Sequence, residues 1–167
     1  VTVDGVHTFT DIVLTNGAKL VHSINFGEAT NAMRLTARKV YISTNSSIDV
    51  SGRGLVGQQT TNSSYRAGGS YGGRGANYGS SIAADVFGDY REPQELGGRS
   101  RFNSNNKRSG GSVYLKADEL ILDGTILANG EASSSGPAGG SIWVDAGVLK
   151  GLGSMSAAGG NADYYSS

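Results

Sequence analysis

The chain has 167 residues, with 14 basic and 14 acidic side chains, 27 glycines, two prolines and no cysteine. A formal net charge of zero removes the general electrostatic attraction to nucleic acid or an anionic membrane, and the lack of cysteine excludes disulfides and thiolate metal sites. No apolar run is long enough to span a bilayer, so we expect no membrane insertion and one domain over residues 1–167. Abundant glycine with little proline favours short strands and turns over helices.

The first two copies of a recurring strand pattern occupy residues 12–22 and 33–52, the first of them incomplete. Apolar and polar residues alternate in both copies, which is the periodicity of a strand. Each complete copy contains three predicted short strands. One constant shift places Ile12, Leu14, Leu20 and His22 on Val40, Ile42, Ile48 and Val50.

Residues 53–110 form an insertion that lacks the pattern and is rich in glycine, tyrosine and arginine. Loops this long are usually functional or disordered, and the aromatic residues argue against disorder. Tyrosine and arginine are common interface anchors, so we predict Tyr65, Tyr71 and Tyr78 as ligand or partner contacts. The alternative is a structural flap that caps one face of the fold or packs against a neighbouring subunit.

Two further copies begin at the Gly-Gly-Ser triplets of residues 110–112 and 139–141. The third copy aligns with the second when Val113 is placed on Met33 and a slip is allowed before the last strand. The first strand of each complete copy ends on an alanine, which we expect at a crowded corner. The inward positions of that strand are Met33, Leu35 and Ala37, then Val113, Leu115 and Ala117, then Ile142, Val144 and Ala146.

Repetition at a period within the range of about 20–50 residues indicates stacked supersecondary units. Parallel strands about 4.8 Å apart would align like side chains in columns. The sequence therefore predicts an all-β fold, a right-handed parallel β-helix (β-solenoid) of about four to six coils with one long insertion. Because the array has no obvious polar caps at its ends, it is more naturally the middle of a longer array than a whole one.

The aligned copies place Arg34, Tyr114 and Trp143 at one outward position on successive coils if the insertion is looped out. An aromatic ladder flanked by arginine can bind the apolar faces of sugar rings or an aromatic surface of a partner. These three residues are therefore predicted contacts for a ligand or partner. The alternative is that the insertion folds back over the rings and makes them a second small core.

Hydrolysis needs two convergent carboxylates, one to donate a proton and one to stabilise charge or attack. Asp118 and Glu119 are adjacent, so on a strand we expect them to point to opposite faces. Glu92 and Glu95 lie in the insertion with no visible framework. These pairs do not predict a catalytic centre.

The basic residues of segment 99–108, near Asp123, resemble in outline the basic residues of β-helical polysaccharide lyases that use calcium. Calcium needs about six to eight convergent oxygen ligands, for which the sequence gives no pattern. His7 and His22 are interpreted as ordinary loop or strand residues. We therefore predict no catalytic residue, no metal site and no cofactor.

Residues 139–146, Gly-Gly-Ser-Ile-Trp-Val-Asp-Ala, with Leu149, Gly153, Met155 and the Ala-Ala-Gly-Gly of residues 157–160, resemble the glycine-rich repeats of large secreted and cell-surface proteins, commonly microbial. The resemblance is best over residues 110–161, moderate over 32–54 and absent from the insertion. It implies a parallel β-helix, an extracellular or cell-surface location and an adhesin-like or matrix-like role. No catalytic motif carries over.

We therefore expect a structural repeat module of an extracellular surface, fibre or matrix protein that acts in adhesion or self-assembly. Its expected partners are neighbouring copies or modules of the same protein and cell-surface or matrix polysaccharide, with no nucleic acid. One alternative is a carbohydrate-binding module that uses the outward aromatic column. A second alternative is a fragment of a β-helical polysaccharide lyase or hydrolase.

Overall fold

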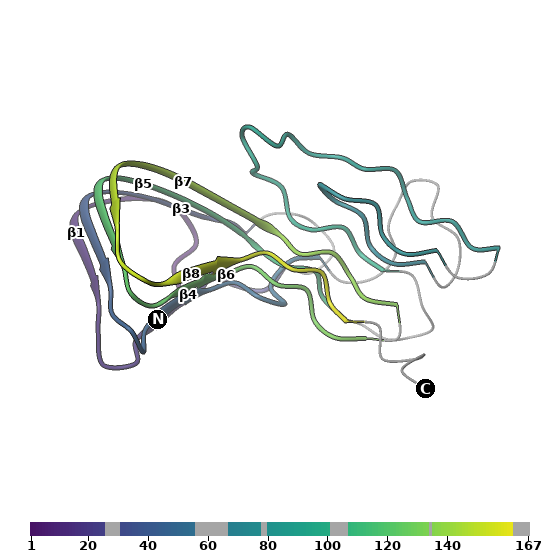
Figure 1. Cartoon of the computed structure of the whole chain (residues 1–167), viewed down its shortest axis with the longest axis horizontal. Helices are drawn as coiled ribbons and strands as arrows, with labels where there is room; N and C mark the ends of the chain where they lie inside the picture. Colours follow the sequence, from purple (N-terminus) through teal and green to yellow (C-terminus); the bar gives the residue numbers. More distant parts are fainter. Residues whose placement is uncertain (26–30, 56–66, 78–79, 101–106, 134, 162–167) are drawn as a thin grey trace.

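The computed structural model describes residues 1–25, 31–55, 67–77, 80–100, 107–133 and 135–161, which contain eight β-strands and no helix. The predicted all-β class is confirmed. The strands form two parallel four-stranded sheets, ordered β1-β3-β5-β7 and β2-β4-β6-β8 (Figure 1). Their bounds are β1 Gly5–Leu14, β2 Lys19–Leu20, β3 Met33–Ile42, β4 Ser47–Asp49, β5 Ser112–Leu122, β6 Thr125–Leu127, β7 Ser141–Lys150 and β8 Ser154–Ser156.

The chain alternates between the sheets, so that each repeat unit supplies one long strand and one short strand. The four units are β1–β2, β3–β4, β5–β6 and β7–β8. Gly5 pairs with Met33, Met33 with Val113 and Val113 with Ile142, which confirms the predicted alignment of the copies. The slip before the last strand is confirmed as well, because Ile48 pairs with Ile126.

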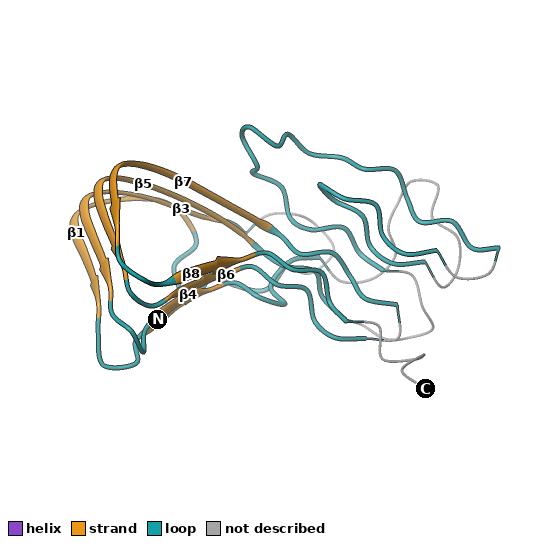
Figure 2. Cartoon of the chain, in the orientation of Figure 1, coloured by secondary structure: helices purple, strands orange, loops and turns teal. Residues whose placement is uncertain are grey.

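The division of each unit into three strands is wrong, because the first two predicted strands run together as one bent strand. In β3 the inward residues alternate as far as Ala37, then Arg38 and Lys39 both point outward, and alternation resumes at Val40. Backbone pairing continues on both sides of this break and omits only Arg38 and its counterpart Asp118. Figure 2 shows the long strands bending together. The small Ala37 lies just before the bend, as expected for a crowded corner.

The core lies between the two sheets and consists of columns of apolar side chains that repeat from unit to unit. Leu35 and Leu115 pair on neighbouring long strands, while Ile48 and Ile126 pair on short strands, and all four are fully buried. Complete burial of such a side chain contributes about 1.5–3 kcal/mol. These repeated columns therefore supply most of the apolar stabilisation of the two sheets.

Away from the strands, glycine-rich extended segments lie side by side and form what we call the glycine-rich region, at the right of Figure 1. It comprises parts of the insertion together with the segments that link the later repeat units. Its backbones are joined by bonds from Gly97 N–H to the Gly110 carbonyl at 3.1 Å and from Gly140 N–H to the Ala128 carbonyl at 2.7 Å. A Cβ atom on Gly140 would overlap the Gly111 carbonyl oxygen. Glycine is therefore required here by close backbone approach.

Candidate functional site

The predicted column is present as a row of outward side chains across the long-strand sheet. Arg34 pairs with Tyr114 and Tyr114 with Trp143, and all three are partly exposed. The Tyr114 and Trp143 rings lie 4.5 Å apart between centroids and are tilted by 49°. Val6 occupies the same position on β1. The structure thus brings three predicted contact residues together, although their role in binding remains a prediction.

Charged side chains flank the aromatic pair at the next outward position along the strands. Lys116 of β5 pairs with Asp145 of β7, and their side-chain nitrogen and oxygen are 3.3 Å apart. Both side chains are more than half exposed, so the ion pair contributes little to stability. Lys116 can donate and Asp145 can accept hydrogen bonds beside the two rings.

Tyr71, the described member of the three predicted tyrosines, lies in a separate cluster within the insertion. Its ring is 5.2 Å from that of Phe87, and its hydroxyl donates to Glu95 Oε2 at 3.1 Å. Burial, and then the neighbouring Glu95 carboxylate, raise the pKa of Tyr71 to about 12. The other two predicted contacts, Tyr65 and Tyr78, lie outside the described residues.

The serines of the two Gly-Gly-Ser triplets fasten the insertion to the long-strand sheet. Ser112 donates its hydroxyl to the Gln94 carbonyl at 2.9 Å, and Ser141 donates to the Glu95 carbonyl at 2.8 Å. The two hydroxyl oxygens are themselves 2.9 Å apart, and both serines are buried. This part of the insertion is thus bonded along the start of β5 and β7.

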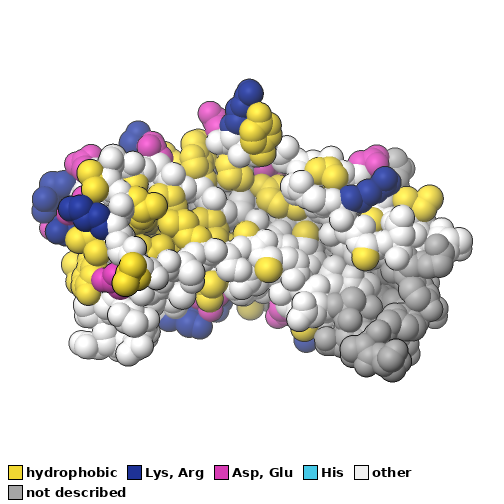
Figure 3. All heavy atoms as spheres, in the orientation of Figure 1, with side chains coloured by type: hydrophobic (Ala, Val, Ile, Leu, Met, Phe, Trp, Pro, Cys, Tyr) yellow, Lys and Arg dark blue, Asp and Glu magenta, His cyan; other side chains and the backbone are white. Residues whose placement is uncertain are grey.

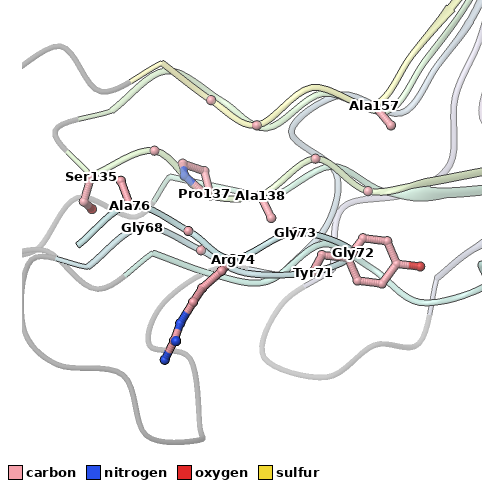
Figure 4. Close-up of a pocket in the computed structure, with 17 residues that line it drawn as sticks. Gly68, Tyr71, Gly72, Gly73, Arg74, Ala76, Ser135, Pro137, Ala138 and Ala157 are labelled. Carbon is pink, nitrogen blue, oxygen red and sulfur yellow. The ribbon is translucent and has the colours of Figure 1, made fainter. Parts of the chain in front are cut away.

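A groove of about 540 Å³ lies in the glycine-rich region, and Figure 4 shows it between segments 68–76, 135–140 and 157–160. Its walls are mainly glycine backbone, with Tyr71 and Arg74 on the insertion side. A surface of this composition offers amide and carbonyl groups and little side-chain chemistry. It suits an extended backbone better than a compact ligand.

The expected separation of Asp118 and Glu119 onto opposite faces is wrong, since the bend in β5 turns both toward the outer surface. Glu119 accepts from Lys150 at 2.6 Å and lies 3.0 Å from Lys39, so it links three long strands. Hydrogen bonds from Lys150 and then Lys39 hold the pKa of Glu119 below its ordinary value. Across the described part of the chain, histidine and carboxylate side chains nowhere gather in a group able to hold a metal ion.

His22 is fully buried and belongs to the inward column of Val50, as its sequence alignment suggested. Its Nδ1 donates to the Ser23 carbonyl at 2.7 Å, so Nε2 is the unprotonated nitrogen that accepts from the Ser112 amide at 3.3 Å. Burial lowers the pKa of His22 below its ordinary value of 6.5. The nearby charges are the Asp4 carboxylate, which opposes this shift, and the Arg53 guanidinium, which adds to it.

We expect the protein to lose stability as the pH falls from about 7.5 to about 5.5. In the unfolded chain His22 binds a proton near pH 6.5, whereas in the folded chain it binds one only at a lower pH. Stability is therefore lost as the pH falls through 6.5 toward the lowered pKa of the folded state. Urea denaturation of the wild type and His22→Gln, compared at both pH values, checks this. A pH dependence that His22→Gln leaves intact would assign the effect to other groups, and His7→Gln, at an exposed position, is the control.

Within the described residues the β7–β8 unit is the last of the stack, and members of its apolar columns are exposed. Leu149 pairs with Leu120, yet Leu149 is 58% exposed whereas Leu120 is fully buried. Met155 likewise pairs with the buried Ile126 and is 39% exposed. Figure 3 shows hydrophobic side chains gathered in the area that β7 and β8 enclose. We call this surface the β7–β8 end.

The shift that matches the two Gly-Gly-Ser triplets also places Leu149 on Leu120 and Met155 on Ile126, but neither Leu149 nor Met155 was predicted as a contact residue. The exposure of the β7–β8 end could have been predicted from the repeat pattern, because no later described unit follows to cover the apolar residues of β7 and β8. The groove could not have been predicted, because the only sequence feature its segments share is a high glycine content, which does not reveal which segments lie together. No helix in the described residues has the length and apolar character needed to cross a bilayer.

No family model, curated protein or solved structure matches this chain. Its two parallel sheets and uncovered apolar end define it by architecture alone, as an all-β protein of repeated long-strand and short-strand units.

Proposed function

We propose that the chain is a structural repeat module of an extracellular surface, fibre or matrix protein, that it folds as a right-handed parallel β-helix, and that it acts in adhesion or self-assembly. The extracellular setting rests on the resemblance of its glycine-rich repeats. The observation that carries the assembly role is the β7–β8 end, where Leu149 and Met155 are exposed members of otherwise buried columns. A contiguous exposed apolar patch is typical of an interaction surface.

The edge strands support the same role. β1 and β7 bound the long-strand sheet and β8 bounds the short-strand sheet on one side, so these edges offer backbone groups that can pair with further strands. The β2 edge is already covered by residues 1–3, which bond to the backbone of Lys19 and Val21. Ion pairs also connect neighbouring units along the direction of assembly, although each is partly exposed and contributes little to stability. They join Asp11 to Arg38 and Glu119 to both Lys39 and Lys150.

Size-exclusion chromatography with light scattering over a wide concentration range, followed by negative-stain electron microscopy, tests this proposal. We expect end-to-end oligomers or filaments that Leu149→Lys abolishes, because the substitution would place a charge in the apolar contact. Val148→Lys adds the same charge at the neighbouring position, which aligns with the outward Glu119, and should retain assembly. A wild-type chain that stays monomeric at the highest concentration contradicts self-assembly.

A carbohydrate-binding role is the second candidate, favoured by the 4.5 Å pairing of Tyr114 and Trp143. Aromatic faces bind the apolar faces of sugar rings, and the adjacent Lys116–Asp145 pair can donate to and accept from hydroxyl groups. Polysaccharides of cell surfaces or matrices are the corresponding ligands. The structural and binding roles are compatible, because the column lies outside the apolar core.

For this candidate we expect Trp143→Ala to reduce affinity for a bound polysaccharide about tenfold or more, through loss of one stacking face. Glycan-array screening of the wild type would select the ligand, and titration calorimetry would compare the variants. Tyr41→Ala removes an outward aromatic residue from another position of the same sheet and should leave affinity unchanged. Equal losses in the two variants would contradict a site at the Tyr114–Trp143 pair.

A further inference from the structure

A contact of the kind that would cover the β7–β8 end already exists one unit earlier in the stack, where the β7–β8 unit covers the β5–β6 unit. There the Ser141 amide donates to the Gly111 carbonyl at 3.0 Å, and the Gly140 amide donates to the Ala128 carbonyl at 2.7 Å. The long strands pair in parallel with Ile142 opposite Val113. Within the chain itself, a Gly-Gly-Ser triplet followed by a strand with alternating apolar residues therefore covers the β5–β6 unit.

The β7–β8 end presents the same set of groups again, one unit later in the stack. Gly140 and Ala157 are the counterparts of Gly111 and Ala128, and within the described residues no donor reaches either of their carbonyl oxygens. The Ser141 hydroxyl is the counterpart of the Ser112 hydroxyl. Gly140 and Ala157 also line the groove of the glycine-rich region, so the two acceptors lie at the groove, directly before the start of β7 and after the end of β8.

We propose that the β7–β8 end binds a glycine-rich coil of another polypeptide, in which a Gly-Gly-Ser triplet precedes a strand of alternating apolar residues that pairs in parallel with β7. The inference rests on the proposed assembly role and names its partner. The amide of the bound serine would donate to the Gly140 carbonyl, and that of the preceding glycine to the Ala157 carbonyl.

The second glycine of the triplet decides which partner fits. A Cβ atom on Gly140 would overlap the Gly111 carbonyl oxygen, so any side chain at the corresponding position of the partner would meet the Gly140 carbonyl oxygen in the same way. A second copy of this chain would offer its β1 edge, before which residues 2–4 are Thr-Val-Asp and not a Gly-Gly-Ser triplet. The Val3 amide there already donates to the Val21 carbonyl at 2.8 Å. Copies can therefore stack through their apolar columns, but a glycine-bearing coil makes the better contact.

The test is binding of a fluorescent peptide with the sequence of residues 139–150, measured by anisotropy against the full chain. The control peptide carries alanine in place of the second glycine. We expect the control to bind at least about tenfold more weakly, because its methyl group blocks both amide contacts. We also expect Leu149→Lys to lose binding about tenfold or more while Val148→Lys retains it.

A spin label at the amino end of the peptide tests the orientation, and should broaden resonances at the start of β7 near Trp143 and spare those near Lys150. Equal binding of the two peptides, broadening at the opposite end, or no binding at about 1 mM would each overturn the inference. The circular dichroism spectrum and unfolding midpoint of Leu149→Lys establish that it is folded. Should it be unfolded, the two peptides on wild-type protein decide the matter.

The same experiments separate this inference from the proposed function. Filaments that form while the peptide fails to bind would overturn the glycine-coil partner and leave the assembly role standing. Peptide binding to a chain that never self-associates would support the partner and contradict self-assembly. When both occur, saturating peptide should shorten the oligomers by occupying the β7–β8 end.

Discussion

Gly140→Ala is expected to lower the free energy of unfolding by about 2–4 kcal/mol. The new methyl group would overlap the Gly111 carbonyl oxygen and the Gly110 backbone, neither of which can rotate away as a side chain can. Relief of that overlap would lengthen the 2.7 Å bond from the Gly140 amide to the Ala128 carbonyl. Urea denaturation followed by circular dichroism measures the change.

Gly73→Ala is the matched control, because no atom lies within 4 Å of the position its Cβ would take and its φ is not in the left-handed region. Its free energy of unfolding should change by no more than about 0.5 kcal/mol. Similar losses in the two variants would show that general glycine flexibility, and not close backbone approach, explains the glycine content.

The second large effect concerns the apolar columns. Leu120→Ala is expected to cost about 2–5 kcal/mol, because the side chain is fully buried and its loss leaves a cavity between neighbouring units. Leu149→Ala removes the same atoms from the same column one unit later, where the side chain is 58% exposed, and should cost less than about 1 kcal/mol. Chemical denaturation of both variants under dilute conditions provides the comparison.

A concentration series extends this experiment. If the β7–β8 end is covered by a second molecule, the cost of Leu149→Ala should increase with protein concentration while that of Leu120→Ala stays constant. Equal costs in dilute solution would mean that the end is covered in the monomer and would contradict its description as open.

The columns could be predicted from the sequence because alternation and the matched shifts are both visible in the order of residues. Met33, Val113 and Ile142 were aligned correctly, and so was Ile48 with Ile126 after the slip. Such patterns depend only on which side of a strand each residue faces. The outward column of Tyr114 and Trp143 follows from the same register.

The bend and the glycine-rich region could not be predicted in the same way. At Arg38 and Lys39 two consecutive outward residues suggest a strand boundary, yet the backbone pairs on either side and the strand continues. In the glycine-rich region the decisive contact joins Gly140 to Gly111, residues without side chains to mark their mutual position. Only the spatial arrangement shows why alanine would not fit there.

The insertion between β4 and β5 leaves the register of the sheets unchanged, since Met33 still pairs with Val113 and Ile48 with Ile126. Loop-closure entropy increases only slowly with length, by about 0.6 kcal/mol for each doubling. The connection between β4 and β5 is therefore a suitable place to insert foreign sequence. A peptide or small domain grafted there would be displayed at a fixed level of the stack, and longer arrays could carry such grafts at regular intervals.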